Sequence, residues 1–327
     1  MSSSENDEVV SKSFYIMRML AIISVATAHC SSYIGFFPET LRQMIGTIGV
    51  PIFFISSGYY FKPVKTVYCF LEKRKSVIIP WVIFGILTYA LEGLKVGRFS
   101  GEGLIRWIFG YKTWLYYVPV LICFYILFQL FNSNIWIAIW EIVFLIFFCL
   151  STLGIIMEDN GWITLYQIPF NNIGFFAAGI ALKRYGIEKV ICCTIRKKTI
   201  VIIAFLLISV LYLNSGQIGY WESILSIPFE LLSSIVVLWI SRALSLVEIF
   251  IDVGKHTYFI YFIHMQIVIY IVSKMLIITK LNNVIPEIVL LFIKPLLIVS
   301  ISYLIWRLLN IIARKMNITN LSWIIAV

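Results

Sequence analysis

Residues 14–35 read FYIMRMLAIISVATAHCSSYIG, an apolar run of 22 residues that contains one arginine and one histidine. A helix needs about 20 apolar residues to cross the ~30 Å hydrocarbon core of a bilayer, so this run is long enough to span it. A signal peptide is a poor interpretation, because a polar stretch precedes the run and no A-x-A-like cleavage site follows it. The run therefore predicts a first transmembrane helix.

The rest of the chain repeats this pattern. Hydrophobic residues make up 61% of the sequence and charged residues 13%, where soluble domains average about 25% charged. The predicted fold is an all-α integral membrane protein: one bundle of about ten transmembrane helices over 14–312, with a polar tail at 1–13 and a short tail at 313–327. The predicted spans lie near 14–35, 43–61, 76–93, 113–131, 135–156, 163–182, 199–214, 221–240, 256–279 and 288–312.

The net charge of +10 reflects membrane topology. In a soluble chain it would suggest nucleic acid, but here the cations lie mainly between apolar runs. With the N-terminus inside, sixteen Lys and Arg fall in cytoplasmic segments and six in outer ones, which follows the positive-inside rule. An even helix count then places both termini in the cytoplasm, and the partner is the lipid bilayer of the inner membrane, with no nucleic acid. The six cysteines lack disulfide or metal spacing, so we expect no metal.

Arg18 and His29 are the polar residues of the first span. Eleven residues at 100° each make three turns plus about 20°, so both side chains share one helix face, roughly 16 Å apart along the axis. Neutral imidazole at His29 suits proton transfer from a hydroxyl, and Arg18 suits an anionic group. The alternative is that Arg18 extends to the headgroups and His29 is a hydrogen-bonded core histidine.

Several segments match a known family in order. The Arg-x10-His spacing in the first span is similar to the signature of the membrane acyltransferase-3 family. Five further segments resemble its motifs: VPIFFISSGY at 50–59, the basic Arg74 before Pro80, TWLYY at 113–117, NIGFFAAG at 172–179 and GKHTYFIYFIH at 254–264.

The resemblance implies transfer of an acyl group, usually acetyl, from cytoplasmic acetyl-CoA to a hydroxyl of a polysaccharide or lipid-linked oligosaccharide. It also implies that Arg18 and His29 are essential, with Arg18 positioning the donor and His29 acting as general base or acyl relay. At the start of the third span, Lys73, Arg74 and Lys75 are the candidates to hold the CoA phosphates. The family often has Arg-x-x-Arg there, whereas in this chain Val77 stands where the second arginine of that motif would be. The alternative is that the three cations only set the membrane topology.

Other polar and aromatic residues are candidates to line the substrate cavity. They are Ser57, Trp114, Tyr117, Asn172, Glu230, Tyr261 and His264. For His264 the alternative is a core histidine bonded to Tyr261 or to a backbone carbonyl. For Trp114 and Tyr117 it is an aromatic belt at the outer interface, and for Glu230 it is a structural ion pair with Lys294.

A rival function is a polytopic transporter or flippase of a glycan or lipid precursor, since such proteins also carry polar residues at mid-membrane and Pro-interrupted helices. The sequence shows no internal repeat that would favour it. The acceptor sugar, and whether the protein forms a homo-oligomer, are not given by the sequence.

Overall fold

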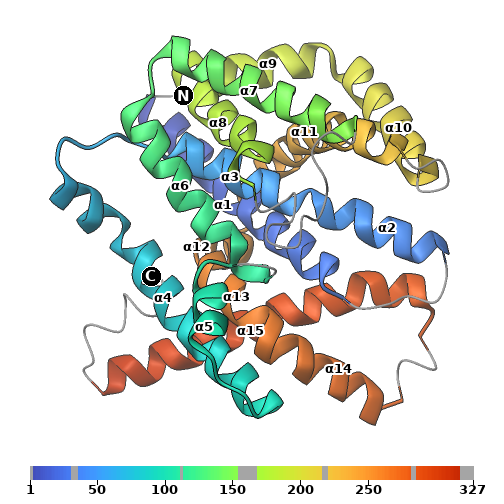
Figure 1. The fold of residues 1–327 in the computed structure, drawn as a ribbon. Coiled ribbons are helices and arrows are strands. Elements are labelled where there is room, and N and C mark those ends of the chain that lie inside the picture. Colours follow the sequence, from blue (N-terminus) through green and yellow to red (C-terminus); the bar gives the residue numbers. More distant parts are fainter. Residues whose placement is uncertain are drawn as a thin grey trace. The chain divides into compact units, whose positions relative to one another are not determined.

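The structure, a computed structural model, describes residues 3–30, 36–110, 113–153, 168–215, 220–280 and 285–316 of the 327-residue chain. All regular secondary structure in these ranges is helical, which confirms the predicted all-α class (Figure 1). Parts of the first, fifth and sixth predicted spans, at 31–35, 154–156 and 163–167, lie outside the described residues, as does most of the predicted C-terminal tail.

The chain forms two compact units, each assembled from two stretches of sequence. Unit 1 comprises residues 1–56 and 181–304, and unit 2 comprises 57–180 and 305–327. Unit 1 contains α1 (Ser3–Ala28), α2 (Phe36–Thr47), most of α3 (Gly49–Tyr59), α9 (Ile187–Arg196), α10 (Lys198–Ser215), α11 (Tyr220–Ala243), α12 (Glu248–Lys255), α13 (Thr257–Ile263), the π-helical turn η4 (His264–Val268), α14 (Ile269–Ile278) and most of α15 (Glu287–Lys315). Unit 2 contains α4 (Val67–Val96), α5 (Gly101–Ile108), η1 (Trp114–Tyr116), α6 (Tyr117–Leu130), α7 (Asn134–Thr152), η3 (Pro169–Asn171) and most of α8 (Ile173–Tyr185).

Helix α1 is the central element of unit 1. It packs against α2, α11, α12 and α13, and its residues Ile16 and Met19 form a buried cluster with Ile251 of α12. A Cβ atom on Gly254 would overlap the backbone carbonyl of Tyr15, so only glycine lets α12 lie this close to α1. This close packing fixes the helix that carries Arg18.

The span predicted as one helix over 43–61 consists of two helices, α2 and α3, separated at Ile48. Pro51 has no N–H to donate to the carbonyl four residues earlier, and the helix is interrupted there. A Cβ on Gly49 would lie 2.6 Å from the carbonyl oxygen of Ala21. The small residues Ala21 and Ser24 on α1, together with Gly49, therefore let α3 approach α1 closely.

Unit 2 has an aromatic core. Phe176 of α8 makes ring contacts with Phe61, Tyr125 and Phe128. A Cβ on Gly58 would overlap the Phe176 carbonyl oxygen, so the last turn of α3 and helix α8 meet at backbone distance. The SGY and FFAAG segments thus meet at one close helix contact.

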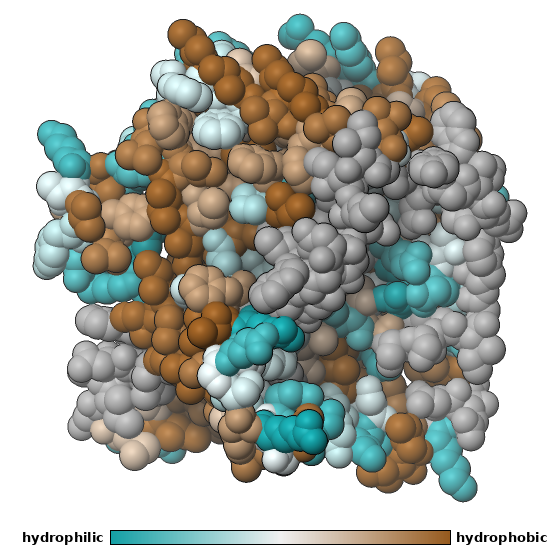
Figure 2. Space-filling view, viewed as in Figure 1, coloured by the Kyte–Doolittle hydropathy of each residue, from teal (hydrophilic) through white to brown (hydrophobic). Residues whose placement is uncertain are grey.

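Five described helices are long and apolar enough to cross a membrane, over Asp7–Ala28, Val67–Val96, Asn134–Thr152, Ile224–Ala243 and Glu287–Lys315. Shorter apolar helices lie over Trp114–Leu130, Lys198–Asn214 and Ile269–Ile278. Large apolar side chains are exposed along these helices, and Figure 2 shows them gathered on much of the visible face. A multi-pass membrane protein is confirmed, and the count of about ten spans stays a prediction.

Candidate active site

Arg18 of α1 is hydrogen-bonded to the first residue of the Ser-Ser-Gly segment at 56–58. Its Nε donates a hydrogen bond to the Ser56 hydroxyl at 2.7 Å, and Ser56 is fully buried. The sequence motif predicts a cavity-lining role for Ser57 and none for Ser56. The rotation of α3 about its axis relative to α1 decides which of the two adjacent serines faces α1. The sequence indicates only that both serines belong to the same motif.

His29 follows directly after the last residue of α1. Its backbone N–H donates to the carbonyl of Val25 at 3.3 Å, which is the i to i−4 bond of a helix. The helical register therefore continues through His29, so the eleven-residue spacing still places it on the Arg18 face. Ile22 and Val25, between them on that face, are buried.

The structure brings His264 against His29. The two ring centroids are 5.6 Å apart with an interplanar angle of 45°. His264 is fully buried, and its Nδ1 donates to the carbonyl of Tyr261 at 2.6 Å, because a carbonyl oxygen only accepts. In the neutral ring, the lone pair is then on Nε2. The backbone bond expected of a core histidine is present, and the ring also lies beside His29.

Cationic groups surround the end of α1. Arg42 of α2 donates to the carbonyl of Ala28, the residue before His29, and pairs with Glu39. Lys294 of α15 and Arg42 both lie close enough to the Cys30 thiol to act on it electrostatically. Arg42 is one of the six cations that the topology prediction places in outer segments, and the sequence motifs give it no role in the site.

In unit 2, Arg74 is buried in an aromatic cage. The side chain is 8% exposed, and its guanidinium carbon lies 3.9 Å from the ring centroid of Tyr125 and 5.5 Å from that of Phe61. Its Nε and Nη2 atoms have no hydrogen-bond partner among the described residues. A buried guanidinium with unmet donors is costly unless a ligand supplies acceptors.

The two lysines beside Arg74 point elsewhere. Lys73 Nζ donates to the carbonyl of Lys62 at 3.2 Å, and Lys75 pairs with Glu72 at 2.6 Å on the surface of α4. Consecutive helical residues diverge by about 100°, so the three side chains do not converge on one point.

The remaining predicted residues are divided between the units. In unit 2, the hydroxyl groups of Ser57 and Tyr117 lie 3.3 Å apart, and Trp114 and Asn172 are buried. In unit 1, Tyr261 is buried beside His264, their ring centroids 5.8 Å apart. Glu230 is half-buried in α11 and forms no ion pair with Lys294 among the described residues.

Within the described ranges, no three His, Cys, Asp or Glu side chains are grouped as metal ligands. The fold and site thus define a multi-pass helical membrane protein that carries polar residues at the end of a buried helix. A family model described as an acyltransferase domain, acyltransferase family 3, matches residues 12–307, and the chain belongs to that family. The resemblance seen in the sequence motifs is therefore confirmed. No curated protein and no solved structure matches the chain significantly.

Proposed function

We propose that this membrane acyltransferase transfers an acetyl group from cytoplasmic acetyl-CoA to a hydroxyl of a surface polysaccharide or lipid-linked sugar. The protein lies in the inner membrane with both termini in the cytoplasm, as the distribution of its cations suggests. The observation that carries the proposal is the His29–His264 pair at the end of the helix that also holds Arg18.

His29 supplies the base. The acceptor hydroxyl oxygen attacks the thioester carbonyl carbon while His29 takes its proton, the carbon–sulfur bond breaks, and the CoA thiolate takes the proton from His29. The products are the acetyl ester and CoA. In the relay variant, a His29 ring nitrogen attacks the thioester carbonyl carbon, the carbon–sulfur bond breaks, and CoA leaves as the thiol with the proton from the ring. The acceptor hydroxyl then attacks the acetyl-imidazole, the carbon–nitrogen bond breaks, and the hydroxyl proton returns to the ring. His264, whose Nδ1 donates to the Tyr261 carbonyl, packs beside the His29 ring and limits its rotation.

Arg18 and Arg74 serve the donor. The Arg74 guanidinium has two donors aimed at no described acceptor, and the geometry of this group suits the paired oxygens of a phosphate. Arg74 therefore binds a CoA phosphate, and the exposed Lys73 and half-buried Lys75 add positive charge at the same helix end. Arg18, whose Nε donates to the Ser56 hydroxyl, positions the acyl arm.

The test uses the protein purified in detergent, acetyl-CoA labelled in the acetyl group, and surface polysaccharide from the native cell that mild base has freed of esters. We expect base-labile label in the polysaccharide and release of CoA thiol in equal amounts. His29→Ala should abolish both signals. The third histidine of the chain, His256, contacts Asp252 at 3.6 Å outside the pair, and His256→Gln is the matched control that should retain activity.

The outcomes separate the candidate functions. Label on the protein in the absence of glycan, lost in His29→Ala, supports the relay, whereas label only in the glycan supports the general base. Movement of the polysaccharide across reconstituted vesicles without ester formation would overturn the proposal in favour of a transporter.

A further inference from the structure

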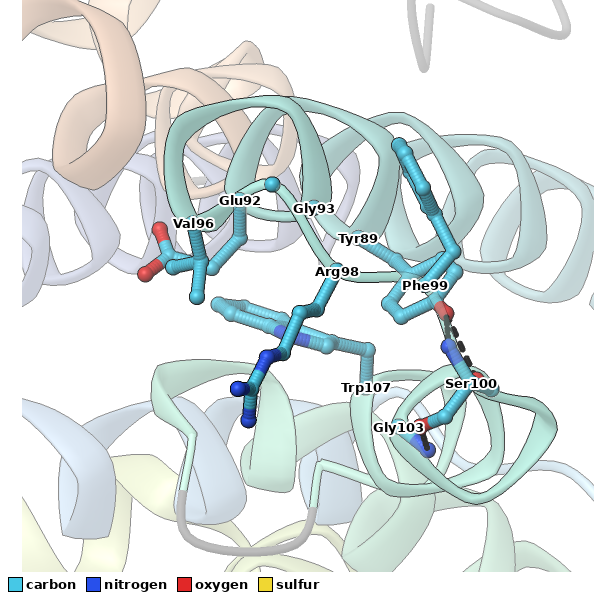
Figure 3. Close-up of a pocket in the computed structure, with 10 residues that line it drawn as sticks. Tyr89, Glu92, Gly93, Val96, Arg98, Phe99, Ser100, Gly103 and Trp107 are labelled. Atoms are coloured by element: carbon cyan, nitrogen blue, oxygen red, sulfur yellow. Dashed lines mark hydrogen bonds between the residues drawn. The ribbon is translucent and has the colours of Figure 1, made fainter.

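A pocket lies at the C-terminal end of α4, remote from Arg74 in the same unit. Its volume is about 680 Å³, which falls within the range of ~300–1,000 Å³ typical of small-molecule sites. Figure 3 shows the Trp107 ring reaching from α5 toward α4, with the Arg98 side chain extending beside it. The lining residues are Tyr89, Glu92, Gly93, Val96, Gly97, Arg98, Phe99, Ser100, Gly103 and Trp107.

The lining combines aromatic faces with one group of each charge. Trp107, Tyr89 and Phe99 are aromatic, and Glu92 and Arg98 form no ion pair with each other or with another described residue. A carboxylate that accepts and a guanidinium that donates can bind neighbouring hydroxyl groups, while an indole face packs against C–H groups. A hydroxyl-rich, uncharged ligand with an apolar ring face fits this set, and a sugar has that chemistry.

The wall of the pocket is fixed by hydrogen bonds. The Tyr89 hydroxyl donates to the Ser100 carbonyl at 2.6 Å and accepts from the Ser100 N–H, and the Ser100 hydroxyl caps α5 by accepting from Gly103 N–H at 2.9 Å. Gly97, at φ 71°, ends α4 in the left-handed conformation. The turn between the helices is therefore preorganised, which lowers the entropic cost of binding.

The length of α4 sets the pocket apart from the donor end. Arg74 and Val96 are 22 residues apart on one helix, which at 1.5 Å per residue is about 33 Å, close to the thickness of the hydrocarbon core. If Arg74 binds CoA at the cytoplasmic surface, the pocket opens at the opposite surface, where a surface glycan is exposed.

We propose that the α4–α5 pocket is the acceptor-binding subsite, in which a sugar ring stacks on Trp107 and its hydroxyls bond to Glu92 and Arg98. This inference rests on the proposed function, because it needs a glycan acceptor and the cytoplasmic placement of Arg74.

The experiment measures KM for both substrates with the purified full-length protein, acetyl-CoA and the base-treated native polysaccharide. Trp107→Ala should raise KM for the polysaccharide by ~10-fold and leave KM for acetyl-CoA within twofold. Glu92→Gln should raise KM for the polysaccharide by ~3-fold. Phe109→Ala is the control, since Phe109 is an exposed aromatic two residues from Trp107 outside the pocket, and both KM values should stay unchanged.

Each result decides one point. A rise in KM for acetyl-CoA alone would overturn the proposal and assign the pocket to the adenine of CoA, and no change in either KM for Trp107→Ala and Glu92→Gln would also overturn it. If Trp107→Ala fails to fold, the test uses Glu92→Gln, which keeps the side-chain volume nearly constant, and Arg98→Gln, which replaces an exposed side chain. Failure of the unmodified protein to acetylate any glycan would refute the proposed function instead.

Discussion

Unit 1 and unit 2 each carry an arginine on an apolar helix, half-buried at Arg18 and buried at Arg74, and the two arginines have different surroundings. Arg18 in unit 1 donates to the buried Ser56 hydroxyl at 2.7 Å. Arg74 in unit 2 rests on the Tyr125 ring, and its Nε and Nη2 meet no acceptor among the described residues. The first arginine is held by the protein, and the second has donors available for a ligand.

Under the proposed function, this difference gives the two arginines different tasks. A side chain that is already hydrogen-bonded is preorganised, which serves the chemical step. A buried guanidinium with unmet donors gains most when an anion arrives, which serves binding. We therefore propose that Arg18 and His29 serve the chemical step and that Arg74 recognises the donor phosphates.

The largest effect expected from this division is the loss of transfer in His29→Ala. Removal of a general base costs up to ~10⁴-fold in rate, and we expect a drop of at least ~10³-fold with acetyl-CoA affinity within twofold of the original. Single-turnover kinetics together with equilibrium binding of labelled acetyl-CoA measure both quantities. An equal loss of acetyl-CoA binding would contradict the assignment of His29 to the chemical step.

Arg74→Ala should give the opposite pattern. Loss of hydrogen bonds to a charged phosphate costs about 1.5–3 kcal/mol, so KM for acetyl-CoA should rise ~10–100-fold while kcat at saturation stays nearly constant. Lys75→Ala, which removes a surface ion pair with Glu72, is the matched control and should change KM less than ~3-fold. A fall in kcat at unchanged KM would show that the guanidinium has a structural role.

Ser56→Ala tests the internal partner of Arg18. One neutral hydroxyl bond is worth about 1 kcal/mol, so kcat should fall ~5-fold while KM for acetyl-CoA changes little. Arg18→Lys in the same background should add little further loss if both changes disrupt one hydrogen bond. Fully additive losses, measured as a double-mutant cycle, would separate the two residues.

Tyr117→Phe should have the smallest effect. The Tyr117 hydroxyl lies 3.3 Å from the Ser57 hydroxyl, a long and therefore weak contact. We expect kcat/KM to fall by no more than ~3-fold, and thermal unfolding followed by intrinsic fluorescence to shift little. A loss of activity comparable to that of Arg74→Ala would place Tyr117 in direct contact with substrate.

The sequence predicts the part of the site that depends on one helix. Arg18 and His29 need only the rise and twist of α1, and the continuous hydrogen bond from His29 to Val25 preserves that register. Likewise, ranges such as 76–93 and 199–214 fall on α4 and α10 because apolar length alone identifies them.

Contacts between helices could not be predicted from the sequence. The rotation of α4 relative to Tyr125 decides which of Lys73, Arg74 and Lys75 is buried. That rotation is set by packing against residues far along the chain. The contact between His29 and His264 has the same origin. The predicted spans 76–93 and 113–131 leave 94–112 between them as a connection. In the structure this segment contains the short helix α5, which forms one side of a pocket.

The π-helical turn at His264–Val268 has a further consequence for the chain. The N–H of Ile269 bonds to the carbonyl of His264, five residues earlier, so this turn holds one residue more than an α-helical turn. A wide turn of this kind absorbs one extra residue locally, whereas an extra residue in a regular α-helix would rotate every later side chain by about 100°. A one-residue deletion within 264–268 should therefore convert this wide turn into an α-helical turn. It should leave the orientation of the helix that follows unchanged.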